Sequence, residues 1–216
     1  MATRTSSNLT IASFAGYYGG WASKEPENTS GYYFGTGSSY GPLCIKFKIP
    51  SINNFSNRNP AVTFSFEANG VGYYTTCNFT ATVRTSNYSS NSTSAQGTAV
   101  SKGVKQSMSI SASSFSSVTT SAITITSSSV KADNSTYYYC WFTSPGGNYQ
   151  VRKITGKVYY DAYTQCSAPT SIKFKYNGKE NSSPYTHPSD GGTGDVTLQW
   201  SGAKAGAGMG IAGYIV

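Results

Sequence analysis

The sequence predicts an all-β protein, folded as an antiparallel β-sandwich, from two observations. The first is period-two alternation over residues 41–67, which is typical of half-buried strands. One face of this pair of strands carries the apolar residues Leu43, Ile45, Phe47 and Ile49, then Val62, Phe64 and Phe66. The second is composition: Tyr (18) and Gly (23) are abundant, and no segment has apolar residues at helical spacing. Aromatic and β-branched residues favour a pleated, half-buried surface.

The other strands follow in chain order from the same alternation. They are expected at 8–18, 31–35, 73–84, 107–111, 121–127, 136–143 and 150–163. In the first of them, Leu9 and Ile11 alternate against Thr10 and Phe14. Turns are predicted at 69–70 (Asn-Gly) and 145–147 (Pro-Gly-Gly), a loop-rich region at 16–41, and a long surface connection at 85–106. Roughly eight to ten short strands at this spacing suit a sandwich or barrel.

The composition changes at Cys166, which predicts two modules, 1–165 and 166–216. The second alternates again at 171–176, 195–200 and 211–216. It is too short for a complete sandwich, which takes about 100 residues. We therefore expect either further chain or strands from a partner.

The net charge of +8 comes from 16 basic residues scattered along the chain. The densest groups are Lys46/Lys48, Lys102/Lys105, Arg152/Lys153/Lys157 and Lys173/Lys175/Lys179. Such charge can serve nucleic acid or an anionic surface. The more common role is a solvated strand face that also blocks edge-to-edge aggregation, so no nucleic-acid partner is expected.

The four cysteines, Cys44, Cys77, Cys140 and Cys166, lie far apart and form no C-x-x-C pair, so neither a metal nor another cofactor is expected. Cys77 and Cys140 lie on apolar faces, Cys44 lies on the lysine face, and the spacing does not require a disulfide. The amino terminus lacks an apolar signal-peptide core, and no run approaches the ~20 apolar residues of a membrane span. We expect synthesis in a cytoplasm without membrane insertion.

The region 16–41 holds a group of aromatic residues, Tyr17, Tyr18, Trp21, Tyr32 and Tyr33. Tyrosine and tryptophan give large, flat contact areas at low entropy cost, which suits the apolar faces of sugar rings. Three interpretations stay open: contact with a glycan, packing against a neighbouring subunit, or capping of the open end of the sandwich.

The segment 136–143 is bulky on both faces. Tyr137, Tyr139 and Trp141 alternate with a second set of large residues at 138, 140 and 142, which predicts a central strand covered on both sides. One face belongs to the core. The other is a candidate binding surface or oligomer interface, and we favour the interface.

Enzyme interpretations find little support in the sequence. His187 is the only histidine and lies in a turn, so a catalytic triad is not expected. Glu25 and Glu27 flank Pro26 beside an aromatic residue, as in some glycosidase sites, but the surrounding sequence predicts a loop that buries neither carboxyl group. Asp133/Asn134 and Asp190/Asp195 could bind calcium, although turn capping is the simpler role, and no metal site is expected.

Four segments resemble a family of jelly-roll modules in minor structural and tail-associated proteins of bacteriophages that infect gut bacteria. They are Tyr32-Tyr33-Phe34, SSYGPLCIKFKIPSI, ITITSSSVKADNSTYYYCWF and KVYYDA. The end of the chain, CSAPTSIKFKY and GGTGDVTLQWSGAKAGAGMGIAGYIV, is similar to the first strands of immunoglobulin- or fibronectin type III-like modules.

The resemblance implies a jelly-roll-like sandwich over 1–165 and a partial immunoglobulin-like module over 166–216. It also implies a non-enzymatic virion protein of a tail or fibre, assembled in the host cytoplasm from copies of itself and other virion proteins, with contact to host-surface glycans. The alternative is a monomeric carbohydrate-binding or adhesive module of a bacterial cell-surface protein.

Overall fold

The computed structural model describes residues 3–18, 21–35, 40–52, 55, 60–85, 97–143, 146–162, 171–176, 179–181 and 196–201. The chain divides into two compact units. One is Arg4–Asp161, and the other comprises Ala162–Val216 together with Met1–Thr3. Within the described ranges there is no helix, and so none that could span a membrane.

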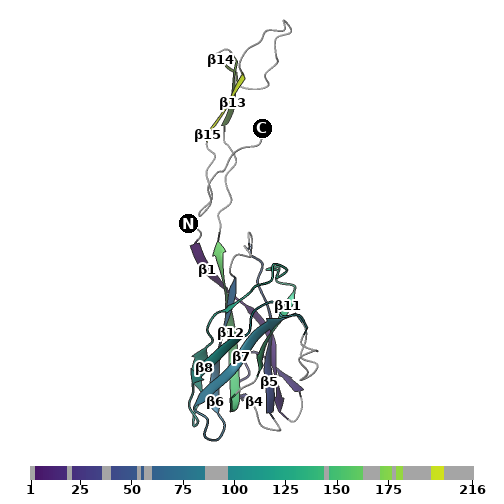
Figure 1. The fold of residues 1–216 in the computed structure, drawn as a ribbon, viewed down its shortest axis with the longest axis vertical. Helices are drawn as coiled ribbons and strands as arrows, with labels where there is room; N and C mark the ends of the chain where they lie inside the picture. The colour runs from purple at the N-terminus through teal and green to yellow at the C-terminus, as the bar shows by residue number, and fades with distance from the viewer. Residues whose placement is uncertain are drawn as a thin grey trace. The chain divides into compact units, whose positions relative to one another are not determined.

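Two six-stranded sheets make up the first unit (Figure 1). Sheet 1 contains β1 (Thr3–Asn8), β4 (Tyr32–Gly35), β6 (Ala61–Gly70), β9 (Ser116–Thr119), β10 (Ile123–Thr124) and β12 (Asn148–Ala162). Sheet 2 has the order β3 (Trp21–Lys24), β2 (Thr10–Tyr18), β5 (Tyr40–Lys48), β11 (Tyr137–Thr143), β7 (Thr76–Arg84), β8 (Val104–Ser109). The predicted all-β sandwich is confirmed.

Among strands β4 to β12, the first pairs with the last, the second with the second last, and so on toward the middle of the sequence. β4 pairs with β12, β5 with β11, and β7 with β8, all antiparallel. β6 pairs with β9 and β10, which follow one another along the same edge of β6. Two further pairings, β12 with β6 and β11 with β7, join these pairs into the two sheets.

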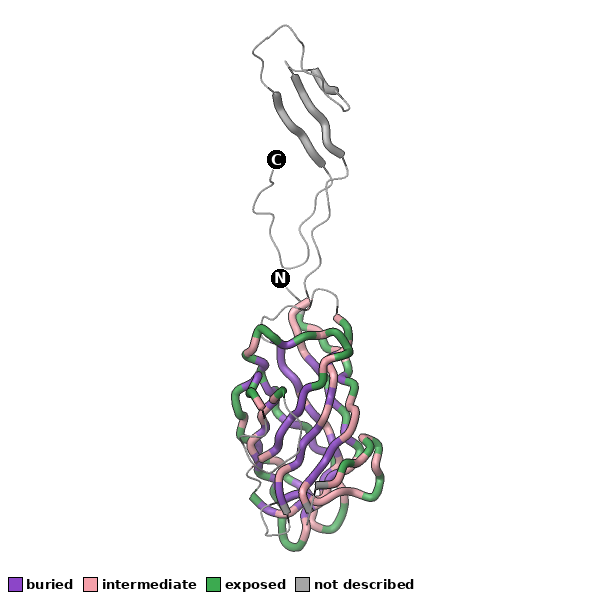
Figure 2. The backbone as a smooth tube through the Cα atoms, turned by 90° about the vertical axis from the view of Figure 1, so that its right-hand side faces the viewer, coloured by how far each residue is buried: buried purple, intermediate pink, exposed green. Residues whose placement is uncertain are grey.

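The core lies between the sheets, where buried positions run along the strands while exposed residues gather in the turns (Figure 2). The predicted apolar faces of β5 and β6 are confirmed, since all seven predicted residues, including Ile49 directly after β5, are buried. The ring of Phe142 packs edge-on against Phe64, Phe66 and Phe79, with ring centroids 4.8–6.1 Å apart. Aromatic pairs of this geometry stabilise a core beyond the area that they bury.

The alternation predicted for 8–18 is wrong at Phe14, which is fully buried. The register between β2 and β5 shifts between Ile11 and Ser13. This β-bulge adds one residue to β2, so Phe14, opposite Ile45, returns to the side occupied by Ile11, which lies opposite Phe47.

The turn predicted at Asn69-Gly70 is also misplaced, because β6 continues through Gly70. Gly70 pairs with Tyr149 of β12, and its N–H donates to Ser111 O at 2.9 Å. The turn instead occupies 71–75, and β7 begins at Thr76 rather than Tyr73. Four short strands were not predicted, namely β1, β3, β9 and β14 (Lys179–Asn181).

The described part of the second unit is a three-stranded antiparallel sheet with the order β14-β13-β15. β13 (Ser171–Tyr176) and β15 (Val196–Ser201) confirm the strands predicted at 171–176 and 195–200. In their register Ile172 lies opposite Trp200 and Phe174 opposite Leu198. The strand predicted at 211–216, the module boundary at 165/166, and the residues Cys166, His187, Asp190 and Asp195 lie outside the described residues.

Candidate functional site

The turn between β6 and β7 presents Tyr73 to solvent. Tyr73 is 99% exposed, more than any other large hydrophobic residue described. The turn is anchored at its base, where Val71 N–H donates to Asn148 O at 2.8 Å. Gly72 adopts a φ of +79°, a conformation that side chains rarely accept. Tyr73 is therefore an exposed ring on a backbone held by hydrogen bonds.

Tyr74 joins this turn to the body of the sandwich. Its ring is 41% exposed and its centroid lies 6.1 Å from that of the buried Tyr149. The Tyr149 hydroxyl lies 2.6 Å from Thr76 O and 2.8 Å from Gly146 O, and it can donate its proton to either. Burial raises the pKa of Tyr149 to about 12. This network ties the start of β7 to Gly146, just before β12, beneath the two exposed tyrosines.

The predicted aromatic group closes the corner between β2 and β4. A Cβ on Gly16 would lie 2.7 Å from Tyr33 O and 2.9 Å from the Tyr32 ring, so only glycine permits this approach. Tyr32 packs against the core, which supports capping for this residue, and Lys24 Nζ lies 5.5 Å from its ring centroid. Tyr17 lies over Gly41.

Backbone pairing places the remaining two members of the group at the same corner. Trp21 lies opposite Tyr17, and Tyr18 lies opposite Tyr40. The side chains of Trp21 and Tyr18 lie outside the described part of the chain. The structure thus brings all five predicted positions together at the level of the backbone.

The aromatic corner and the exposed turn lie at one end of the sandwich. The first residues of β12 join them, because Asn148 pairs with Gly35 at the end of β4 while Tyr149 pairs with Gly70 at the end of β6. We call this the tyrosine end, made of Tyr17, Tyr18, Trp21, Tyr32, Tyr33, Tyr73 and Tyr74. Sequence reasoning missed the last two because it assigned Tyr73 and Tyr74 to a strand.

The predicted interface trio on β11 is mostly buried within the chain. Trp141 is fully buried and Tyr139 is 8% exposed, and both pack with Cys44 in a small cluster separate from the main core. β11 lies between β5 and β7, as expected for a central strand. Only Tyr137, 40% exposed, is available to a partner without rearrangement of the chain.

The described cysteines are free and buried. Burial raises the pKa of the Cys77 thiol to about 12, and raises those of Cys44 and Cys140 well above the ordinary range. Thiols held in their neutral form are poor nucleophiles and poor metal ligands. Their role is packing.

The described acidic residues show no arrangement typical of catalysis. Glu25 and Glu27 are both exposed, and Glu27 lines an open groove of about 470 Å³ beside Ser65 and Lys157. Asp133 caps a turn, where its carboxylate accepts bonds from the N–H groups of Ser135 and Thr136 at 2.8 Å. Those bonds hold its pKa well below the usual range. In the part of the chain that is described, no three potential metal ligands cluster.

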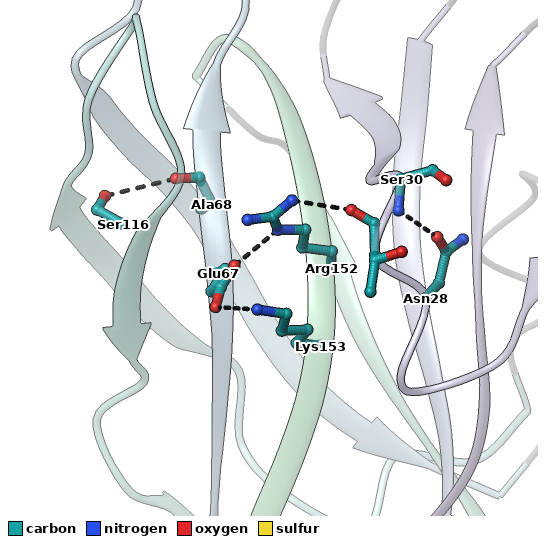
Figure 3. Close-up of polar contacts among 8 residues, drawn as sticks. Asn28, Ser30, Glu67, Ala68, Ser116, Arg152 and Lys153 are labelled. Carbon is teal, nitrogen blue, oxygen red and sulfur yellow. Dashed lines mark hydrogen bonds and ion pairs between the residues drawn. The ribbon is translucent and has the colours of Figure 1, made fainter.

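An ion-pair network lies on the outer face of sheet 1 (Figure 3). Glu67 on β6 accepts from Arg152 Nε at 2.6 Å and from Lys153 Nζ at 2.8 Å. Arg152 also donates to Thr29 O at 2.9 Å, and its guanidinium lies 3.8 Å from the ring centroid of Phe115. A β-bulge in β12, with Lys153 at a φ of +52°, turns both cations toward Glu67. The network holds the β3–β4 connection against β12.

We expect Glu67→Gln to lower the melting temperature at neutral pH and to remove part of the acid sensitivity of the fold. The two cations lower the pKa of Glu67 in the folded state. Its contribution is therefore fully present above the pKa of the unfolded chain and is lost as the pH falls through the lowered, folded-state pKa. Thermal unfolding of both proteins from neutral to acidic pH measures this.

Glu27→Gln is the matched control, since Glu27 is exposed and has no ion pair among the described residues. The melting curves of the wild-type and Glu67→Gln proteins are expected to converge at low pH. A constant gap between them at every pH would contradict the proposed role of the Glu67 charge.

Comparison of the chain with protein-family models and with curated proteins finds no match.

Proposed function

We propose that this chain is a non-enzymatic structural protein of a bacteriophage tail or fibre, and that its sandwich contacts host-surface glycans through the tyrosine end. The observation that carries the proposal is the presentation of Tyr73, 99% exposed, at the same end as the aromatic corner. An aromatic residue on a backbone already held in place binds with little loss of conformational entropy.

The surroundings of the turn suit a sugar ligand. Tyrosine offers an apolar ring face with a polar edge, which matches the apolar faces and hydroxyl groups of a sugar ring. The 111–114 segment is bonded to Gly70 through Ser111 O, and the hydroxyls of Ser113 and Ser114 lie 3.1 and 3.2 Å from that of Ser111. Hydroxyl groups of this kind adapt their hydrogen bonds to different partners.

The strand order supports the jelly-roll part of the proposal. A jelly roll is built from eight strands in two sheets, wound as two Greek keys. The outside-in pairing of β4 with β12, β5 with β11, β6 with β9/β10, and β7 with β8 follows that scheme. The immunoglobulin-like assignment of β13, β14 and β15 rests on the resemblance of their sequences.

The proposal is tested by binding of the purified full chain to surface polysaccharide extracted from gut bacteria. Tyr73→Ala is expected to weaken binding about tenfold or more, as truncation of an aromatic anchor does in other interfaces. Tyr159→Ala is the matched control, because Tyr159 lies in β12 opposite Ala61, far from the tyrosine end. Equal affinity of wild type and Tyr73→Ala, or no binding by either, would contradict the proposal.

The burial of Tyr139 and Trp141 favours a second candidate, a monomeric carbohydrate-binding or adhesive module of a bacterial cell-surface protein. Because these two side chains are buried within one chain, they are not available for the oligomer interface that the sequence predicted. Light scattering over a range of concentrations separates the two functions. The virion protein is expected to form a multimer, whereas the adhesive module is expected to keep the mass of one chain.

A further inference from the structure

The outer face of sheet 2 carries a group of cations around an exposed ring. Lys48 lies opposite Tyr137, and Tyr139 lies between Lys46 on one side and Arg84 on the other. The ammonium groups of Lys46 and Lys48 lie 4.2 and 5.3 Å from the centroid of the Tyr137 ring. We call the surface formed by Lys46, Lys48, Arg84 and Tyr137 the basic face. Cation–π contacts hold the two lysines in place without neutralising them.

Among the described residues, no carboxylate forms an ion pair with the cations of this face. The segment 4–161 contains five acidic residues, namely Glu25, Glu27, Glu67, Asp133 and Asp161. Asp161 pairs with Arg4 at 3.1 Å, Glu67 pairs with two cations of sheet 1, and Asp133 caps its own turn.

The last two carboxylates belong to the connection between β3 and β4. That connection bonds to β12 of sheet 1, through Ile154 N–H to Pro26 O at 2.8 Å and Lys153 N–H to Asn28 O at 3.3 Å. Lys46 and Lys48 have no ion pair among the described residues. The strands of sheet 2 hold no acidic residue at all. The basic face is therefore of a single sign, which attracts and concentrates anions.

We infer that the basic face binds an acidic polysaccharide, one that carries carboxylates on successive sugars. Lys46 and Lys48 are two residues apart on one strand, ~7 Å, and Lys46 and Arg84 are two strand spacings apart, ~10 Å. This sparse spacing suits a polymer with one charge per sugar or per disaccharide. The half-exposed Tyr137 supplies an apolar edge beside the cations.

Nucleic acid fits this face less well. Single strands bind on open aromatic faces onto which successive bases stack. Here Tyr139 and Trp141 are buried, and the ring of Tyr137 already carries lysine ammonium groups.

The inference does not depend on the tyrosine end. The test uses the full chain and two probes, polygalacturonate and its methyl ester, which differ only in their carboxylate charge. The variant Lys46→Gln/Lys48→Gln is compared with Lys102→Gln/Lys157→Gln, which loses the same charge from two exposed lysines outside the basic face. Circular dichroism verifies that each variant is folded, and affinity is measured at about 50 and 200 mM salt.

Wild type is expected to bind polygalacturonate but not its ester, more weakly at the higher salt concentration. The Lys46/Lys48 variant is expected to lose about tenfold in affinity and the control less than about twofold. The same losses are expected when both double variants are made in the Tyr73→Ala background, which removes the exposed ring of the tyrosine end, so failure at one surface is distinguishable from failure at the other. Equal binding of the ester, equal loss in both double variants, no binding, or tighter binding of an oligonucleotide of similar length would overturn the inference.

Discussion

Trp141→Ala is expected to lower the free energy of unfolding by about 3–5 kcal/mol, as large-to-small changes of buried aromatic residues do. Trp141 is fully buried and packs with Cys44 and Tyr139. Removal of the indole leaves a cavity that the surrounding strands, held by β-sheet hydrogen bonds on both sides of β11, can fill only in part. Urea denaturation of the full chain, followed by circular dichroism, measures the change.

Tyr137→Ala on the same strand face is the matched control. Because Tyr137 is 40% exposed, its truncation is expected to cost less than about 1 kcal/mol. Similar, small losses of unfolding free energy for both variants would show that Trp141 is not part of the packed interior of one chain. They would favour the interpretation of Trp141 as an interface residue.

Gly70→Ala is expected to destabilise the β6–β7 turn by about 3 kcal/mol, the upper part of the range for overpacked sites. A Cβ on Gly70 would overlap the carbonyl oxygen of Tyr74, and the nearby backbone is fixed by bonds from Gly70 and Val71 to Ser111 and Asn148. The turn that carries Tyr73 must therefore move. We expect both a lower free energy of unfolding, measured by denaturation, and a lower affinity for glycan.

Gly72→Ala in the same turn separates the effect of backbone strain at a positive φ from the effect of steric overlap at Gly70. A Cβ on Gly72 would contact nothing within 4 Å, and its φ of +79° costs an alanine only about 1–2 kcal/mol. This variant is expected to be the more stable of the two and to keep Tyr73 exposed. If Gly70→Ala were as stable as wild type, the close packing of this turn would be disproved.

Local pattern was sufficient to predict the centre of the fold. The apolar faces of β5 and β6 follow from alternation alone, because a strand with one buried face must alternate. The position of β11 between two strands followed from its bulk on both faces. In each case the signal lies within about ten neighbouring residues.

Features that depend on distant partners could not be predicted in this way. The bulge between Ile11 and Ser13 is visible only against β5, and Gly70 stays in β6 because Tyr149 and Ser111 pair with it. The Asn-Gly signal alone favoured a turn there. The β9 strand has a polar sequence without alternation and exists as the partner of β6.

In the candidate site, too, local features could be predicted from the sequence, whereas features that depend on distant residues could not. The aromatic group at 17–33 was visible in the sequence as a cluster, and the backbone does bring it together. The exposure of Tyr73 depended on where β6 ended, and so on long-range pairing. The burial of Trp141 depended on Cys44, almost one hundred residues earlier in the chain.

Hydrogen–deuterium exchange of the full chain, with and without surface polysaccharide from gut bacteria, tests the central claim most directly. Binding at the tyrosine end is expected to slow exchange in residues 70–76 and 31–35, and to leave the strand segment 154–160 of β12 unchanged. Protection confined to other segments, or no protection at saturating polysaccharide, would contradict the assignment of glycan contact to the tyrosine end.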